Sequence, residues 1–299
     1  MKTATLFKLA TLPLMAAWIT QAYSQPPIAP ATEAKSGFNN ISISSPSPDP
    51  SNPANAAHLD ALSTFDEVEQ ASPNGLGPIY NAQSCRECHQ NPVSGGASQV
   101  TEHRAGHRVH GVFHTPVVEI QGDKIVNRSL INDRAICAEA QERVPEIDVI
   151  ETNRLSLSVL GDGFIEAVDD QTILDIRKQQ CDVGSQVPGV CGFAIYVPIL
   201  EAAGKSQRIG RFGWKDQHAS LMSFAADAYV NEMGITNQLI PDEFTQVCNP
   251  KVHQGPGDPA KGEVTEPNDL RDPKTHRTDL DQFASFMRET AVPDRKSVV

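Results

Sequence analysis

Apolar residues recur at helical spacing in five segments of the chain, and these segments predict a mainly α-helical protein. The first segment, 56–70, carries its apolar residues at Leu59, Leu62, Phe65 and Val68. A Ser-Pro-Asn-Gly stretch follows this segment, and it predicts that the helix ends in a turn.

The clearest helix prediction lies within 214–234, WKDQHASLMSFAADAYVNEMG. Gly234 suits the C-cap of this helix, because glycine adopts the left-handed conformation at low cost. The predicted apolar stripe consists of Leu221, Phe224, Ala225 and Ala228.

The remaining elements are shorter. Helices are predicted at 128–144, 169–181 and 279–290, and Asp169 or Asp170 suits the N-cap of the second of these. The segment 117–128 predicts a small β-hairpin that turns at Gly122-Asp123. The expected fold class is therefore mainly α, with long loops and one minor hairpin.

The N-terminal 24 residues predict a secretory signal peptide. Lys2 and Lys8 precede the short apolar stretch LATLPLMAAWI, and Ala22 and Ser24 supply the small residues of a cleavage site. Residues 25–55 are rich in Pro, Ser and Asn and predict a disordered linker. The expected organisation is signal peptide 1–24, linker 25–55 and one domain over 56–299.

Composition and charge narrow the classes of partner. The chain has 299 residues, of which 39% are hydrophobic, so it is long enough to bury a sizeable core. Its formal net charge is −12 and its cationic residues form no run, which argues against a nucleic-acid partner or an anionic membrane surface. We expect a periplasmic or secreted protein without a membrane span in its mature form.

The segment GLGPIYNAQSCRECHQNPVSGG, 75–96, contains the chemistry that most constrains function: Cys85, Cys88 and His89 in a CxxCH arrangement. A zinc site would need a second ligand pair, and a thioredoxin-type pair would need a preceding strand in a βαβ unit. The third interpretation uses all three residues. Two thiols on one helical turn attach one haem c covalently, and His89 binds its iron. A chance CxxCH in a disulfide-bonded secreted protein is the remaining alternative.

Four further cysteines predict disulfides in an oxidising compartment. Their pairing is open from the sequence, although Cys181 and Cys191 flank one short loop and form the expected pair. The other two are Cys137 and Cys248.

Three blocks together resemble one known family: 71–96 with its CxxCH, LGDGFIEAVDDQTILDI at 160–176, and GRFGWKDQHASLMSFAADAYVNEMGIT at 210–236. In this order they resemble the di-haem oxidoreductases, described as peroxidases or "thiol oxidoreductases" and related to the di-haem cytochrome c peroxidases. The resemblance extends over about 60–292 and implies a cytochrome-c-like haem domain that transfers electrons to a redox partner protein or to an oxidant such as peroxide. It implies that Cys85 and Cys88 attach the haem and that His89 is an axial ligand.

The chain departs from this family in one respect. Family members carry a second CxxCH after the region that matches 279–295, whereas this sequence has a single CxxCH and ends at Val299. We therefore expect either a C-terminally incomplete domain or a single-haem relative. The two functional hypotheses are a peroxidase-like haem oxidoreductase and a non-enzymatic single-haem electron carrier, with an inactive fragment of a di-haem enzyme as a further alternative.

Several other residues are candidates for the haem environment. A sixth iron ligand or distal acid–base group could come from His103, His107, His110 and His114. The favoured interpretation of each is a polar loop whose histidines are solvated or bond haem propionates beside Arg104 and Arg108. Met222 and Met233 are possible sulfur ligands but are expected in the core.

Glu166 and Trp214 have two interpretations each. Glu166 lies between apolar residues and could donate a proton with a raised pKa, but an ion pair with Arg208 or Arg211 is the favoured interpretation. Trp214 could pack against haem or relay electrons, and a core position is the favoured interpretation.

Overall fold

The protein has a mixed fold of small sheets and helices. The computed structural model describes residues 38–44, 51–71, 75–181, 191–249, 274 and 276–293. Of these residues, 31% are helical and 20% lie in strands or bridges, so the predicted mainly α class is wrong. The predicted signal peptide lies outside the described residues, as does most of the predicted linker.

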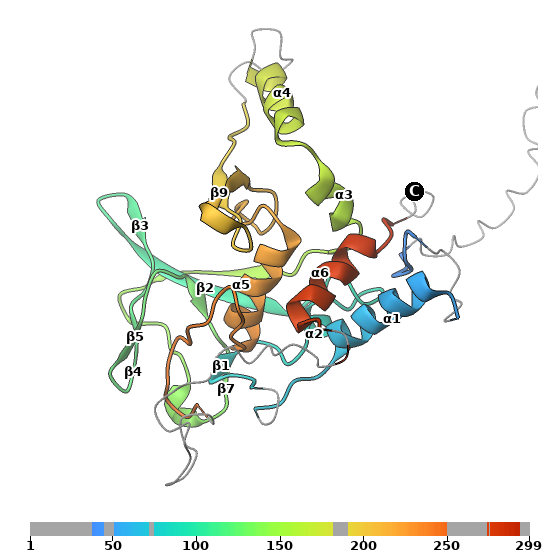
Figure 1. Ribbon diagram of the computed structural model, residues 1–299. Helices are drawn as coiled ribbons and strands as arrows, with labels where there is room; N and C mark the ends of the chain where they lie inside the picture. The colour runs from blue at the N-terminus through green and yellow to red at the C-terminus, as the bar shows by residue number, and fades with distance from the viewer. Residues whose placement is uncertain are drawn as a thin grey trace, which may run out of the picture. The chain divides into compact units, whose positions relative to one another are not determined.

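The helices are arranged around α6, Asp279–Glu289. This helix contacts α1, Pro53–Asp66, α3, Asp162–Ala167, and α5, Leu221–Met233, and Figure 1 shows α1 and α6 lying side by side. Apolar side chains from α1, α5 and α6 contribute to the larger of two buried clusters, and Phe286 of α6 is fully buried within it. These three helices therefore share one core.

Helix α1 forms where the sequence predicted it but buries a different face. The Asn52 side chain accepts a hydrogen bond from the Ala54 N–H at 3.0 Å, so the helix begins earlier than expected. Among the predicted apolar residues Phe65 is buried, whereas Leu59 and Val68 are exposed. The buried face instead includes Asn55, His58 and Ala61.

Helices α5 and α6 have well-defined caps. The Ser220 side chain accepts from the Ser223 N–H at 3.0 Å, and Gly234 adopts φ 64° at the C-cap, as predicted. The predicted helix at 214–234 begins only at Leu221, because Phe212 and His218 pair in a β-bridge before it. Thr278 and Asp281 form a capping box at the start of α6.

Helix α4, Asp170–Cys181, confirms the predicted helix at 169–181. The Asp169 side chain accepts from the Gln171 N–H at 2.7 Å, which supports the start of the helix. The helix has no buried residue, and a disulfide joins its last residue to Cys191 as predicted.

The largest sheet is built on β2. Strands β3, β6 and β8 each pair antiparallel with β2, giving four strands (Figure 1). Their bounds are β2 Thr101–Val109, β3 Val112–His114, β6 Leu130–Ile131 and β8 Ile150–Leu155. This sheet was missed by the helix-based prediction.

The predicted helix at 128–144 is wrong. This segment contains β6, β7, Arg134–Ala135, and a short 3-10 helix, Ala138–Ala140. Strand β7 pairs with β1, Ile79–Tyr80. Long-range pairing thus overrides the local helical pattern, and the buried Asn132 adds hydrogen bonds to distant groups.

Two further strand pairs complete the described structure. Strands β4, Val118–Ile120, and β5, Asp123–Ile125, form the predicted hairpin, and their turn is Gln121-Gly122, one residue earlier than predicted. Strands β9, Tyr196–Pro198, and β10, Gln207–Ile209, pair on either side of a short 3-10 helix, Ala203–Lys205.

Candidate haem-attachment site

The CxxCH motif begins with a single helical turn, α2, Cys85–Cys88. The Ser84 side chain accepts a hydrogen bond from the Glu87 N–H at 3.1 Å, which caps the turn. The Glu87 carboxylate in turn accepts from the Gln83 N–H at 2.8 Å and pairs with Arg134 at 2.6 Å. These contacts hold the turn against β7, so the position of the two cysteines is set by the surrounding fold.

Cys85 and Cys88 are free thiols, whereas the other four cysteines form two disulfides. Burial raises the pKa of Cys85, and the nearby Glu69 raises it further. Burial also raises the pKa of Cys88, to about 12, with Glu232 as the next contribution. Both groups are therefore neutral thiols at neutral pH. This argues against a thioredoxin-type pair, which depends on a lowered thiol pKa.

His89 follows α2 as its C-cap residue. Its backbone N–H donates to the Cys85 carbonyl at 3.0 Å, and its ring Nδ1 lies 3.3 Å from the Gly96 carbonyl oxygen. Burial lowers the pKa of His89 and outweighs the hydrogen bonds to the Leu157 and Gly96 carbonyls, which raise it. The imidazole is therefore neutral, which is the form that binds a metal.

The loop after His89 has a defined shape. The Gly95 N–H donates to the His89 carbonyl at 2.8 Å, and Asn91 pairs with Ala97 in a β-bridge. A Cβ atom at Gly96 would lie 2.0 Å from the Asn91 carbonyl oxygen, so only glycine fits there. The loop thereby presents its Gly96 carbonyl to the imidazole of His89.

A segment that is distant in sequence holds this loop in place. The Ser156 hydroxyl donates to the Cys88 carbonyl, and the Ser158 hydroxyl donates to the Gly95 carbonyl at 3.2 Å. Leu155 and Leu157 alternate with these serines and are exposed. The extended segment after β8 is therefore hydrogen-bonded to the motif and its loop through Ser156 and Ser158.

Acidic and basic groups lie close to Cys88. Arg104 contacts Glu102 on β2, and it lies 4.0 Å from Glu232 at the end of α5. Asn81 donates to the Glu232 carboxylate at 2.6 Å. Burial raises the pKa of Glu232 to about 7, and the negative charge of Glu102 raises it further. This carboxylate was missed by sequence reasoning, although an acidic residue in the last turn of a helix is unfavourable and could have drawn notice.

Replacing Glu232 with glutamine is expected to alter how stability depends on pH. The unfolded chain loses this proton near the ordinary pKa of 4.5, whereas the folded chain keeps it to about 7. The folded state therefore binds more protons between these values, and its stability falls as pH rises through this range. In Glu232→Gln, this fall should be smaller by on the order of 2 kcal/mol.

Urea unfolding of the mature chain at about pH 5 and about pH 8 measures this difference. The matched control is Glu119→Gln, which changes an exposed carboxylate paired only with the exposed Lys124. Equal pH dependence in Glu232→Gln and in the unsubstituted protein would contradict the raised pKa.

The four clustered histidines lie on or beside the β2–β3 hairpin. His103 pairs with Glu151 at 2.9 Å, and His107 pairs with the buried Asp148 at 2.6 Å. His110 occupies the turn with φ 49°, and His114 is exposed on β3. His103 and His107 each have a carboxylate partner, so a solvated side chain, which the sequence favoured, does not describe these two.

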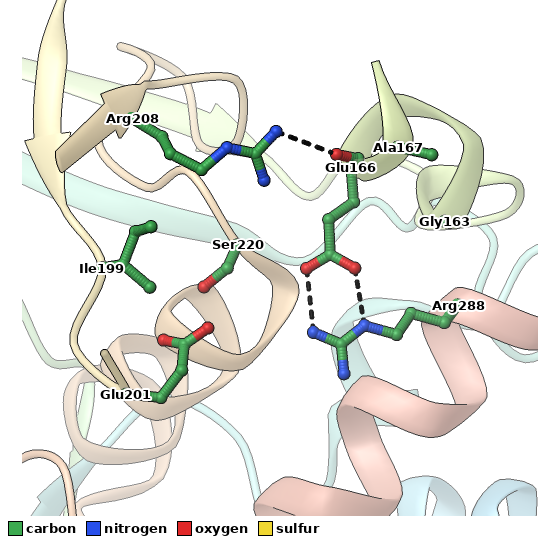
Figure 2. A pocket seen from close by; sticks show the side chains of 8 residues that line it. All are labelled: Gly163, Glu166, Ala167, Ile199, Glu201, Arg208, Ser220 and Arg288. Atoms are coloured by element: carbon green, nitrogen blue, oxygen red, sulfur yellow. Dashed lines mark hydrogen bonds and ion pairs between the residues drawn. The ribbon is translucent and has the colours of Figure 1, made fainter. Parts of the chain in front are cut away.

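Glu166 does not have the raised pKa considered for a proton donor. Burial raises its pKa, but a two-point ion pair with Arg288, at 2.5 and 2.9 Å, and a hydrogen bond from the Leu221 N–H outweigh this and lower it. The predicted Arg208 and Arg211 instead reach the Glu166 backbone carbonyl. Figure 2 shows Glu166 directed at Arg288, with Arg208 on the opposite side.

This ion pair lines an open cavity of about 470 Å³. Glu201 faces the same cavity (Figure 2). Its carboxylate accepts a hydrogen bond from the Ser223 hydroxyl at 2.7 Å. Asp170 is the side-chain ion-pair partner of both Arg208 and Arg211. Sequence reasoning missed Arg288 because 122 residues separate it from Glu166.

The remaining candidates have structural contacts. Met233 is buried in the core and Met222 packs against it, which confirms the favoured interpretation of both. Trp214 is half exposed rather than a core residue, and its indole N–H donates to the Leu155 carbonyl at 3.0 Å.

One group of metal-ligand side chains occurs elsewhere in the described residues: Cys137, Glu139 and Cys248. Its two sulfur atoms are bonded to each other in a disulfide. The group therefore has no thiolate to offer a metal ion.

Comparison with known proteins supports the assignment of family. Residues 113–255 match the family model described as "Di-haem oxidoreductase, putative peroxidase". This match covers a little under half of the chain, and over that part the chain resembles the di-haem oxidoreductases. The matched segment contains β8, Trp214 and α5, while the CxxCH lies before it. No curated protein and no solved structure matches the chain.

The description of the matching family model implies haem as the cofactor, and the residues at α2 fit that group. Cys85 and Cys88 are unbridged thiols on one helical turn and can form two thioether bonds, and His89 offers iron a neutral imidazole. The same description names peroxidase-like oxidoreductase chemistry. None of the helices in the described part of the chain has the length and apolar composition that a membrane span requires.

Proposed function

We propose that the protein is an exported c-type haem oxidoreductase that reacts with peroxide. The observation that carries this proposal is the pair of neutral, unbridged thiols on one helical turn, in a chain whose other cysteines are joined in disulfides. Free cysteines in a disulfide-bonded protein are at risk of oxidation unless they are otherwise engaged. Covalent attachment of haem engages both.

Cys85 and Cys88 would form the two thioether bonds, and His89 would bind the iron. The haem would supply one-electron transfer and a site for the oxidant. Phe65, whose ring centroid lies 6.2 Å from that of His89, covers one side of the imidazole and limits its movement. The Gly96 carbonyl oxygen orients the same ring through Nδ1.

The Glu232 carboxyl group near Cys88 is suited to holding a proton. Glu232 keeps its proton to about pH 7, and Arg104 lies between it and Glu102. Peroxide reduction consumes protons as well as electrons. A protonated carboxyl group near the motif would provide a proton reservoir on the protein side.

Export is the second part of the proposal. The disulfides Cys137–Cys248 and Cys181–Cys191 are typical of an oxidising compartment, which is also where c-type haem is attached. The predicted signal peptide at 1–24 would direct the chain there.

Peroxide turnover tests the proposed reaction. The haem-loaded mature chain should oxidise an electron donor when hydrogen peroxide is added, and its optical spectrum should change on mixing. His89→Ala should alter the iron spectrum more than any other single histidine substitution, because it removes the ligand adjacent to the attachment points. His110→Asn, at an exposed turn with φ 49°, serves as the matched control. A haem spectrum that is unaffected by peroxide would contradict the enzyme and indicate an electron carrier.

A further inference from the structure

Two imidazoles lie side by side on the β2–β3 hairpin, outside the haem-attachment site. His107 on β2 and His114 on β3 occupy directly opposite positions in the antiparallel pair. Their rings are stacked, with centroids 5.5 Å apart and planes 15° apart. Opposite positions in an antiparallel pair place side chains on the same face of the sheet, so both rings share one environment.

A buried carboxylate orients one of these rings. Asp148 is only 1% exposed, and its Oδ1 atom lies 2.6 Å from Nδ1 of His107. Because a carboxylate only accepts hydrogen bonds, Nδ1 carries the proton and Nε2 of the neutral ring keeps its lone pair. A histidine held by a carboxylate in this way is typical of a metal ligand.

The second carboxylate oxygen of Asp148 gives separate support for a bound cation. Asp148 Oδ2 is buried and has no hydrogen-bond partner among the described residues. An unsatisfied buried carboxylate oxygen is costly, and its negative charge favours a cation nearby. A cation near His107 would therefore stabilise the buried Asp148 carboxylate more than the neutral imidazole does alone.

We propose that His107 and His114 bind one divalent transition-metal ion, such as Zn²⁺, with Asp148 orienting His107. Imidazole nitrogen suits metals of this class, and water would complete the coordination. Two nitrogens at about 2.0–2.1 Å from zinc are roughly 3.3 Å apart in tetrahedral geometry. The exposed His114 can reach this distance from His107 by side-chain rotation.

The other histidines of the hairpin are excluded by their positions. His103 lies four residues before His107 on β2 and pairs with Glu151 instead. His110 belongs to the turn between β2 and β3. The net charge of −12 also favours cations at the protein surface. The site does not depend on the presence of haem.

Calorimetric titration of the full mature chain with Zn²⁺, without an affinity tag, tests this site. We expect one Zn²⁺ per chain, and His114→Ala should weaken binding at least about tenfold. Asp148→Asn keeps an oxygen acceptor but removes the charge, and should weaken binding about tenfold. His110→Asn is the matched control and should bind as the unsubstituted chain does.

The exposed position of His114 makes its alanine variant the deciding one, since the substitution leaves the core intact. Circular dichroism checks that each variant is folded, and Co²⁺ absorption reports nitrogen and oxygen ligands directly. Unchanged Zn²⁺ affinity in His114→Ala overturns the proposal. An equal loss in His110→Asn, or no Zn²⁺ bound by the unsubstituted chain, also overturns it.

Discussion

A chain in which Cys85 and Cys88 are both replaced by alanine is expected to carry no covalently bound haem. Each thiol would supply one of the two thioether bonds, so loss of both removes every covalent link to the macrocycle. Each single variant should retain one link and show weakened attachment. Alanine is a strong helix former and preserves the single turn of α2, so the surrounding fold should persist.

Haem staining of a denaturing gel, together with the intact mass of the protein, measures this result. The chain must be matured in a host competent for cytochrome c biogenesis. The matched control replaces Cys181 and Cys191 with alanine, which also removes two sulfur atoms. Their disulfide lies at the end of α4, a helix with no buried residue. Covalent haem remaining in the Cys85→Ala/Cys88→Ala chain would rule out the attachment site. Loss of haem in both double variants would indicate a general folding defect instead.

The largest effect on stability is expected for Phe286→Ala. The Phe286 side chain is fully buried, and its ring centroid lies 4.5 Å from that of Phe65 and 5.5 Å from that of His58. It also packs against Gly95 in the loop after the motif. Removing a buried phenylalanine ring leaves a cavity, so the free energy of unfolding should fall by about 3–5 kcal/mol.

Urea unfolding monitored by circular dichroism provides the measurement. Phe193→Ala is the matched control, because Phe193 is 89% exposed and its loss should change the free energy of unfolding by less than about 0.5 kcal/mol. Similar small effects in both variants would show that Phe286 does not anchor the helical core. Loss of the core should also loosen the loop that orients His89, since Gly95 lies against the same ring.

Local signals in the sequence predicted several elements correctly. Gly234 ends α5 through contacts within a few residues, as predicted, whereas the cap at Ser220 was not predicted. The hairpin of β4 and β5 and the disulfide Cys181–Cys191 likewise join residues that are close in sequence. Such features are predictable because the interacting groups meet whatever the rest of the chain does.

The errors in the predicted fold arise from contacts between distant segments. The segment 128–144 has a helical pattern, yet β6 and β7 gain more from pairing with β2 and β1. In α1 the face that is buried depends on where α6 packs, so His58 is buried while Leu59 is exposed. Hydrophobic spacing predicts that a helix exists, but it does not specify the neighbour against which the helix packs.

The spacing of Cys85, Cys88 and His89 along the chain is enough to place them close together, because all three lie on or next to one helical turn. The properties of their surroundings come from tertiary packing. Burial makes the two thiols and the imidazole neutral. Glu232 and Arg288 reach their partners from segments more than 100 residues away. Burial and long-range ion pairs depend on the packing of the whole chain, and no local pattern encodes them.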